Sequence, residues 1–156
     1  MSEFQAVVFS LNNQLCGADT SQIQEIIKYQ DVSKVPDLPE FVDGIINLRG
    51  KVVPVINLNK RFRLGDIDIT GKTKIIIAKT ENSLIGFIVN DVIGILRFSD
   101  EDIEMTPGVV LNNDNKYLKG IGKKDGMLIS MLDLSRILTE SEVEKLDVEK
   151  LAKEVK

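Results

Sequence analysis

Hydrophobic and polar residues follow one another along this chain in short, mostly apolar runs that are typical of β-strands. In the first half the runs cover residues 4–11, 14–18 and 23–29, followed by two arms on either side of Arg49. In the second half they cover residues 74–79, 84–89, 92–98, 117–121 and 127–132. Strands this short and this closely spaced predict an all-β protein in which each half of the chain forms a small barrel of about five strands.

The clearest single pattern is the hairpin at residues 44–58, GIINLRGKVVPVINL. Its two β-prone runs flank Arg49, Gly50 and Lys51, which predicts a tight turn with an arginine at an exposed tip. Such a tip is suited to docking rather than to catalysis. Pro54 removes a backbone donor from the second run, so we expect that strand to lie at a sheet edge or beside a bulge, where a partner can pair.

Helical patterns are few and short. Residues 39–42 predict a single turn ended by Gly44, and residues 57–64 and 133–138 predict amphipathic turns after the last strand of each half. The charged stretch 141–156 contains a capping box formed by Ser141 and Glu144. This tail is therefore expected to form a surface helix or a frayed end.

The two halves of the chain align with each other. A shift of 69 positions places Gly17 on Gly86, and a shift of 76 places Gly44 on Gly120, Arg49 on Asp125 and Gly50 on Gly126. Glycines that coincide at turn positions favour a duplicated unit. Shared strand periodicity without duplication is the alternative. In either case we expect two similar lobes at residues 1–65 and 66–140, followed by the tail.

The amino-acid composition excludes several kinds of catalytic and metal-binding chemistry. The chain has no histidine, no tryptophan and one cysteine, Cys16. Histidine-dependent triads, histidine zinc sites and histidine phosphorelay chemistry are therefore excluded, as is a disulfide within the chain. Cys16 stands in an apolar stretch and is expected to pack in the core. We find no catalytic, cofactor-binding or metal-binding constellation, and we predict that the protein is not an enzyme.

Charge and hydropathy limit the kinds of partner that the protein is expected to bind. The formal net charge is −4, and the basic clusters at residues 60–63 and 123–124 suit solvated surfaces better than a nucleic-acid interface. No apolar run approaches the roughly 20 residues that cross a bilayer, and the first residues do not form a leader peptide. We expect a cytoplasmic protein that does not bind nucleic acid and does not insert directly into a membrane.

The chain resembles the CheW family of bacterial chemotaxis coupling proteins. The segments that carry this resemblance are the hairpin, the preceding residues 23–26, the turn at 39–44 and the later segment 86–92. The resemblance spans residues 4–138. It implies two five-stranded SH3-like barrels packed against each other. It also implies an adaptor that couples the cytoplasmic tip of a chemoreceptor to the regulatory domain of the histidine kinase CheA, recruited to receptor arrays at the membrane.

The same resemblance implies where the partners bind. The kinase is expected mainly on the first barrel, and the receptor in the groove between barrels. The most specific part of the motif is the hairpin tip Asn47, Leu48, Arg49 and Gly50. The implied receptor-binding residues are Ile23, Glu25, Gly44, Arg49 and Ile95.

The chemistry of these side chains suggests what each would do in receptor binding. Ile23 and Ile95 would form an aliphatic floor for a helical receptor tip. Glu25, two residues beyond Ile23 along a strand, is expected to face the same side and to orient Arg49 through an ion pair. Ordinary explanations stay open: the isoleucines as barrel core, Gly44 as a backbone requirement, and Arg49 as a solvated turn residue.

Other functions also stay open. The chain could be a regulator that binds only the kinase, or a small-ligand module with a pocket between barrels. Because Arg49 aligns with Asp125, the two lobes present opposite charges at equivalent tips. We therefore predict that they do not bind the same surface.

Overall fold

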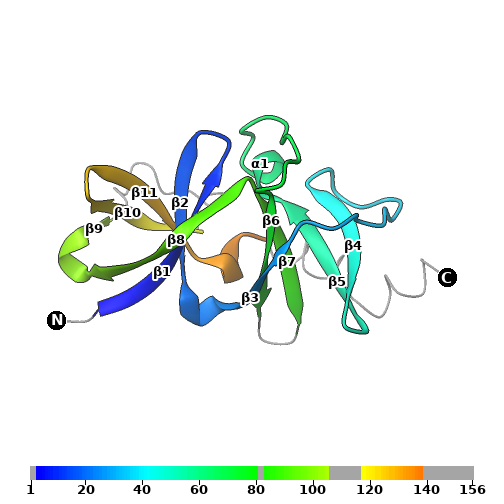
Figure 1. The fold of residues 1–156 in the computed structure, drawn as a ribbon, viewed down its shortest axis with the longest axis horizontal. Helices are drawn as coiled ribbons and strands as arrows, with labels where there is room; N and C mark the ends of the chain where they lie inside the picture. Colours follow the sequence, from blue (N-terminus) through cyan, green and yellow to red (C-terminus); the bar gives the residue numbers. More distant parts are fainter. Residues whose placement is uncertain (1–2, 81–82, 106–116, 139–156) are drawn as a thin grey trace.

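The computed structural model describes residues 3–80, 83–105 and 117–138, which form two β-sheets and almost no helix (Figure 1). The predicted all-β class is confirmed. Sheet A has six strands in the order β8-β1-β2-β11-β10-β9. Their bounds are β1 (Glu3–Leu11), β2 (Gln14–Asp19), β8 (Asp91–Ser99), β9 (Ile103–Met105), β10 (Leu118–Lys124) and β11 (Met127–Leu132).

Sheet B has five strands in the order β3-β6-β7-β5-β4. Their bounds are β3 (Ile23–Lys28), β4 (Val42–Leu48), β5 (Lys51–Asn57), β6 (Lys74–Lys79) and β7 (Leu84–Val89). The helical turns are η1 (Thr20–Gln22), α1 (Leu58–Arg61), η2 (Asp100–Asp102) and η4 (Leu134–Arg136). The predicted helical turns at 57–64 and 133–138 are thus present in shorter form, and the predicted tail helix at 141–156 lies outside the described residues.

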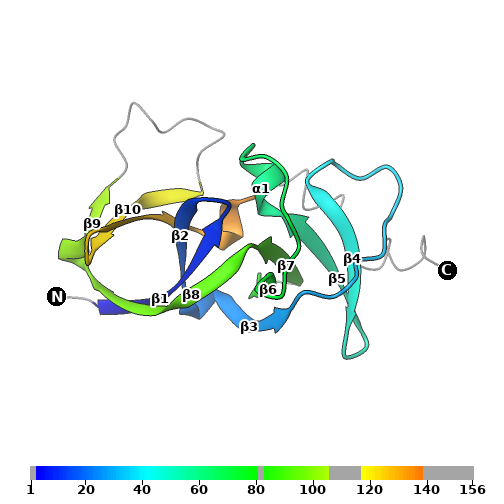
Figure 2. The same cartoon turned by 45° about the horizontal axis from the view of Figure 1, so that its top comes forward.

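The two sheets exchange strands between the halves of the chain (Figure 2). Sheet A combines β1 and β2 of the first half with strands of the second half, and sheet B combines β6 and β7 of the second half with strands of the first. The predicted lobes 1–65 and 66–140 therefore do not coincide with the sheets. Strand periodicity reveals how many strands there are, whereas only long-range pairing decides which sheet each strand joins.

The pairing register shows the same internal repeat in the structure. In sheet A, β2 and β11 are parallel with Gly17 opposite Met131, and in sheet B, β7 and β5 are parallel with Gly86 opposite Val55. A shift of 69 relates the two glycines, and a shift of 76 relates the residues opposite them. The repeat also preserves irregularities, because β4 and β10 each have a register shift just before the aligned glycine.

Among the residues that the structure describes, three hydrophobic clusters hold the sheets together. The largest lies between the sheets and contains Phe9 from sheet A and Phe87 from sheet B, both fully buried. A second cluster lies within sheet B around Ile75 and Ile77, and a third lies within sheet A around Phe98. Because the largest cluster draws on both sheets, each sheet depends on the other to cover its apolar face.

Of the two alternatives predicted for Pro54, the sheet edge is wrong and the bulge is confirmed, because the pairing of β4 with β5 shifts register just before Gly44, which lies opposite Val55. The strand that contains Pro54, β5, lies between β7 and β4 rather than at an edge. Pro54 is nevertheless tolerated, because the pairing of β5 with β7 begins one residue later, at Val55. The strands at the ends of sheet B are β3 and β4, and the edge that the sequence assigned to β5 belongs to β4.

Candidate docking surface

Arg49 occupies the tip of the β4–β5 hairpin, as the sequence predicts. Its φ of 50° and the φ of 89° at Gly50 place both residues in the left-handed region that a tight hairpin turn requires. The side-chain Oδ1 of Asn47 accepts a hydrogen bond from the backbone N–H of Gly50 at 2.8 Å and braces the turn. Leu48 is buried, so it anchors the tip to the cluster within sheet B.

The predicted ion pair between Arg49 and Glu25 is present. Arg49 Nη1 donates to Glu25 Oε2 at 3.2 Å, and Nη2 makes a second contact with the other carboxylate oxygen. Hydrogen bonding to Glu25, with its negative charge, raises the pKa of Arg49 above its ordinary value. The fork geometry fixes the direction of a guanidinium that remains largely exposed, with 66% of its side chain accessible.

Ile23 and Glu25 do not face the same side, contrary to the expectation from strand alternation. A register shift in β3 places Ile23 opposite Ala78 and Glu25 opposite Ile77, which are consecutive residues of β6. Ala78 belongs to the cluster between the sheets, and Ile77 to the cluster within sheet B. Ile23 therefore packs towards the intersheet core, while Glu25 lies on the opposite face of β3, the face of sheet B on which Arg49 contacts it.

Gly44 is buried in β4 with a φ of 146°, a conformation that side chains rarely adopt. A Cβ added there would lie 2.0 Å from the carbonyl oxygen of Ser33. Ser33 and Ile45 exchange backbone hydrogen bonds of 2.8 Å, which hold the segment after β3 against β4. The ordinary explanation for Gly44 is thus supported, and any effect on docking would act through β4.

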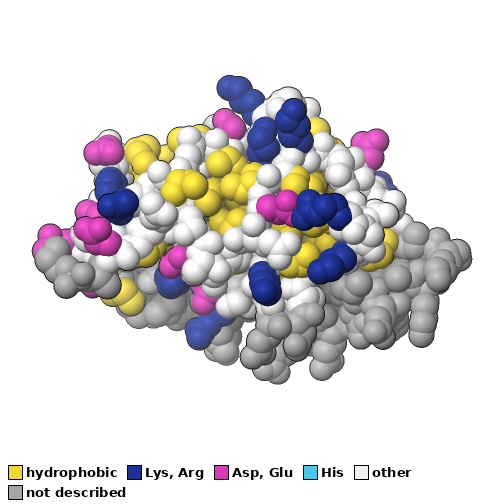
Figure 3. All heavy atoms as spheres, turned by 60° about the horizontal axis from the view of Figure 1, so that its bottom comes forward, with side chains coloured by type: hydrophobic (Ala, Val, Ile, Leu, Met, Phe, Trp, Pro, Cys, Tyr) yellow, Lys and Arg dark blue, Asp and Glu magenta, His cyan; other side chains and the backbone are white. Residues whose placement is uncertain are grey.

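The isoleucines differ in exposure. Ile23 is half-buried against the intersheet cluster. Ile95 of β8 is 59% exposed and lies opposite Val7, a member of the same cluster. Both residues therefore belong to the strand faces that meet between the sheets. Figure 3 shows hydrophobic side chains gathered in the middle of one face, with charged side chains around them.

Sequence reasoning missed Ile93, which is 53% exposed. It is the extra residue of a bulge in β8, because Gly94 and Val92 pair with the consecutive residues Val8 and Phe9 of β1. A shift of 69 aligns Ile93 with Gln24, the corresponding extra residue of β3. Aliphatic periodicity gave no signal for this residue, since a bulge interrupts the alternation on which periodicity depends.

The aligned tip of the second hairpin has different surroundings. Asp125 has a φ of 52°, which matches the backbone of Arg49. The neighbouring Lys123 is ion-paired with Glu104 of β9. The tips of the two hairpins therefore have the same backbone conformation but carry side chains of opposite charge, as the sequence alignment predicts.

The sequence also makes predictions about metal sites, Cys16 and membrane-spanning segments. Among residues 3–80, 83–105 and 117–138, no group of three or more Cys, Asp or Glu side chains could hold a metal ion. Cys16 is buried, and desolvation raises the pKa of its thiol to about 12, so the thiolate needed for nucleophilic chemistry is suppressed. Within this part of the chain, no helix has the length and apolar character needed to cross a membrane.

Comparison with known proteins gives a consistent result. A CheW-like domain matches residues 5–142. Chemotaxis protein CheW of Thermotoga maritima is 34% identical over 145 residues, covering 93% of this chain and 94% of the relative. Chemotaxis protein CheW of Treponema pallidum is 32% identical over 148 residues, covering 92% of this chain and 87% of the relative. The crystal structure of scaffolding protein TtCheW from Thermoanaerobacter tengcongensis has a TM-score of 0.81 at 34% identity, covering 90% of this chain and 96% of that chain.

Two interleaved β-sheets with an exposed, braced hairpin place this protein in a class of all-β proteins that share the fold of scaffolding protein TtCheW. The chain belongs to the CheW-like domain family. The family resemblance drawn from the hairpin motif is therefore confirmed.

Proposed function

We propose that this protein is a non-enzymatic chemotaxis adaptor that couples the cytoplasmic tip of a chemoreceptor to the regulatory domain of the histidine kinase CheA. Family membership and the chemotaxis names of its relatives support the general role. A cytoplasmic location and recruitment to membrane receptor arrays follow from this role.

The observation that carries the proposal is the placement of Arg49. Its guanidinium is exposed yet held in one direction by Glu25, on the same sheet as Ile23. A helical receptor tip presents apolar anchors and polar flanks, so a fixed cation and partly exposed isoleucines on the same protein offer complementary contacts. We assign receptor contact to Ile23, Glu25, Arg49 and Ile95, add Ile93, and give Gly44 an indirect part through β4.

Coupling requires a second surface for the kinase. We place that surface away from the receptor residues, because one adaptor must hold both partners at once. The opposite charges of Arg49 and Asp125 support distinct partners for the two hairpin tips.

Nuclear magnetic resonance titration of isotope-labelled protein tests this function directly. We expect a receptor-tip fragment to shift the signals of Ile23, Arg49 and Ile95, and the kinase regulatory domain to shift signals elsewhere. Binding of the kinase domain alone would support a kinase-only regulator instead. Absence of binding by either partner would refute the adaptor function.

A small-ligand function has one observation in its favour. A cavity of about 400 Å³ lies within sheet A rather than between the sheets, and its lining includes Phe4, Ile103 and Met131. A thermal-shift screen distinguishes this function, because a ligand that binds only the folded protein raises its melting temperature.

A further inference from the structure

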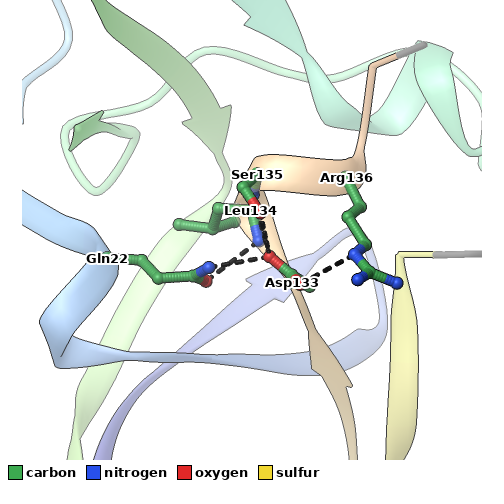
Figure 4. A network of polar contacts seen from close by, with 5 residues as sticks. All are labelled: Gln22, Asp133, Leu134, Ser135 and Arg136. Atoms are coloured by element: carbon green, nitrogen blue, oxygen red, sulfur yellow. Dashed lines mark hydrogen bonds and ion pairs between the residues drawn. The ribbon is translucent and has the colours of Figure 1, made fainter. Parts of the chain in front are cut away.

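Within the described residues the chain crosses between the sheets twice, and a side-chain hydrogen-bond network lies at each crossing. The first crossing runs from β2 to β3 through η1 and ends at Gln22. Figure 4 shows the polar contacts of this residue. Gln22 Nε2 donates to Asp133 Oδ1 at 2.7 Å, and Gln22 Oε1 accepts from the backbone N–H of Leu134 at 3.0 Å. Because Asp133 directly follows β11, this amide ties the start of a sheet B strand to the end of a sheet A strand.

Asp133 is itself held in place. Its Oδ1 accepts hydrogen bonds from the backbone N–H of Ser135 at 3.0 Å and from the Ser135 hydroxyl at 2.6 Å. Its Oδ2 lies 3.4 Å from Arg136 Nε. Gln22 therefore binds a carboxylate that is already held in place. Because its amide nitrogen donates one hydrogen bond and its amide oxygen accepts another, the orientation of the side chain is fixed.

The second crossing runs from β7 to β8 through Asn90. Asn90 Oδ1 accepts hydrogen bonds from Asn59 Nδ2 and from the backbone N–H of Asn12, both at 2.8 Å. Asn90 Nδ2 donates to Asn12 Oδ1 at 3.2 Å. Asn12 lies in the β1–β2 turn of sheet A, and the fully buried Asn59 lies in α1 after β5 of sheet B. This network also joins the two sheets.

The two networks occupy related places in the internal repeat. The first binds the start of η4, and the second binds α1. A shift of 76 places Leu134, the first residue of η4, on Leu58, the first residue of α1. Each crossing is therefore bound to the short helix that follows the last strand of one repeat.

The position of the crossings has a consequence for docking. β3 begins at the residue after Gln22, and β8 begins at the residue after Asn90. These are the end strands of their sheets, and they carry Ile23, Glu25 and Ile95. We propose that Gln22 and Asn90 are positioning residues that set the placement of β3 relative to β8, and so shape the docking surface without contacting the partner. The docking part of this proposal rests on the proposed function.

The decisive variant is Gln22→Glu, which keeps the shape of the side chain but replaces its donor with a carboxylate facing Asp133. The matched control is Gln14→Glu, the same chemical change at the exposed first residue of β2, outside the proposed receptor contacts. The double variant Gln22→Glu with Asp133→Asn restores one donor between the two side chains and tests rescue. Residual dipolar couplings measure the orientation of one sheet relative to the other, and a titration measures affinity for a receptor-tip fragment.

We expect Gln22→Glu to change the relative orientation of the sheets and to weaken tip binding by about three- to tenfold. The double variant should recover part of the lost affinity, because the new amide can donate to position 22 but cannot accept the Ser135 hydrogen bonds at the same atom. The control should leave both measurements unchanged. Dipolar couplings of Gln22→Glu that match the wild type would overturn the proposal, whatever happens to affinity.

A milder variant covers the case in which Gln22→Glu does not fold. Asn90→Asp keeps both accepted hydrogen bonds and loses only the donor to Asn12, so it should change the sheet orientation in a smaller degree. An unchanged orientation in this variant would refute a role for the second crossing. A wild-type protein that does not bind the tip fragment would refute the proposed function and the docking role together, whereas the couplings would still decide whether the networks set the sheet orientation.

Discussion

Arg49 and Glu25 form an ion pair across the two ends of sheet B. Glu25 lies on β3, and Arg49 follows β4, which is at the other end of the strand order β3-β6-β7-β5-β4. The sheet therefore curls until its ends approach each other, and the backbone hydrogen bonds between Ser33 and Ile45 join the same two ends. The pair lies where this curled sheet meets the solvent, so its effect should appear in docking rather than in stability.

The first prediction compares the two hairpin tips. Arg49→Ala should weaken binding of a receptor-tip fragment by about tenfold, because it removes the fixed cation. Asp125→Ala is the matched control, since the two positions have φ values of 50° and 52° and alanine meets the same backbone in both. Titration calorimetry and thermal unfolding check the result. Equal losses of affinity, or loss of the fold, would contradict asymmetric docking.

The second prediction concerns the apolar part of the docking surface. Ile95→Gln should lower tip affinity by about tenfold while leaving the melting temperature nearly unchanged, because the side chain is 59% exposed. Ile69→Gln makes the same change at a residue that is 49% exposed in the connection before β6. A loss of affinity in both variants would point to a general effect of polarity rather than to a contact at Ile95.

The third prediction separates structure from contact at Gly44. Gly44→Ala should destabilise the fold by about 3 kcal/mol, because the new Cβ meets the Ser33 carbonyl and the backbone conformation is unfavourable. Gly71→Ala is the control, since nothing lies within 4 Å of a Cβ at that position. Urea unfolding measures both. A stable Gly44→Ala protein that fails to bind the tip fragment would instead make Gly44 a direct contact.

The fourth prediction concerns the pH dependence of stability at Asp133. Partial burial disfavours its charge, but hydrogen bonds from Ser135 and Gln22, with the nearby Lys119, outweigh burial and lower the pKa. A lowered folded-state pKa means that ionised Asp133 stabilises the fold fully above the ordinary pKa of about 3.9. This stabilisation is lost as the pH falls through the lower folded-state pKa.

Asp133→Asn should therefore be less stable than the wild type near neutral pH, and the difference should shrink in strong acid. Urea unfolding of both proteins between about pH 7 and pH 2 measures it. A difference that stays constant over this range would show that the side chain acts through shape rather than through its charge.

The fifth prediction uses the buried thiol. Because burial raises the pKa of Cys16 to about 12, the native protein should react very slowly with a thiol reagent at mildly alkaline pH. Reaction should become fast in denaturant, which makes Cys16 a probe of opening of the intersheet core. Rapid labelling of the native protein would show that this core opens readily.

Much of the fold and part of the site could be predicted from the sequence. The runs from Phe4 to Leu132 correspond to the main strands, the aligned glycines reveal the repeat, and the motif around Arg49 identifies both the hairpin and the family. The Arg49–Glu25 pair was also predicted correctly. These features depend on local periodicity and turn chemistry, which neighbouring residues encode directly.

Tertiary structure decided the rest. Bulges placed Ile23 and Glu25 on different faces and exposed Ile93, because one extra residue reverses the alternation that a sequence pattern assumes. Long-range pairing exchanged the first two strands of each repeat between the sheets, and so brought Gln22 to Asp133 across a sequence separation of 111. By itself the sequence determined which strands form, whereas burial of apolar faces shared by both sheets determined how they combine.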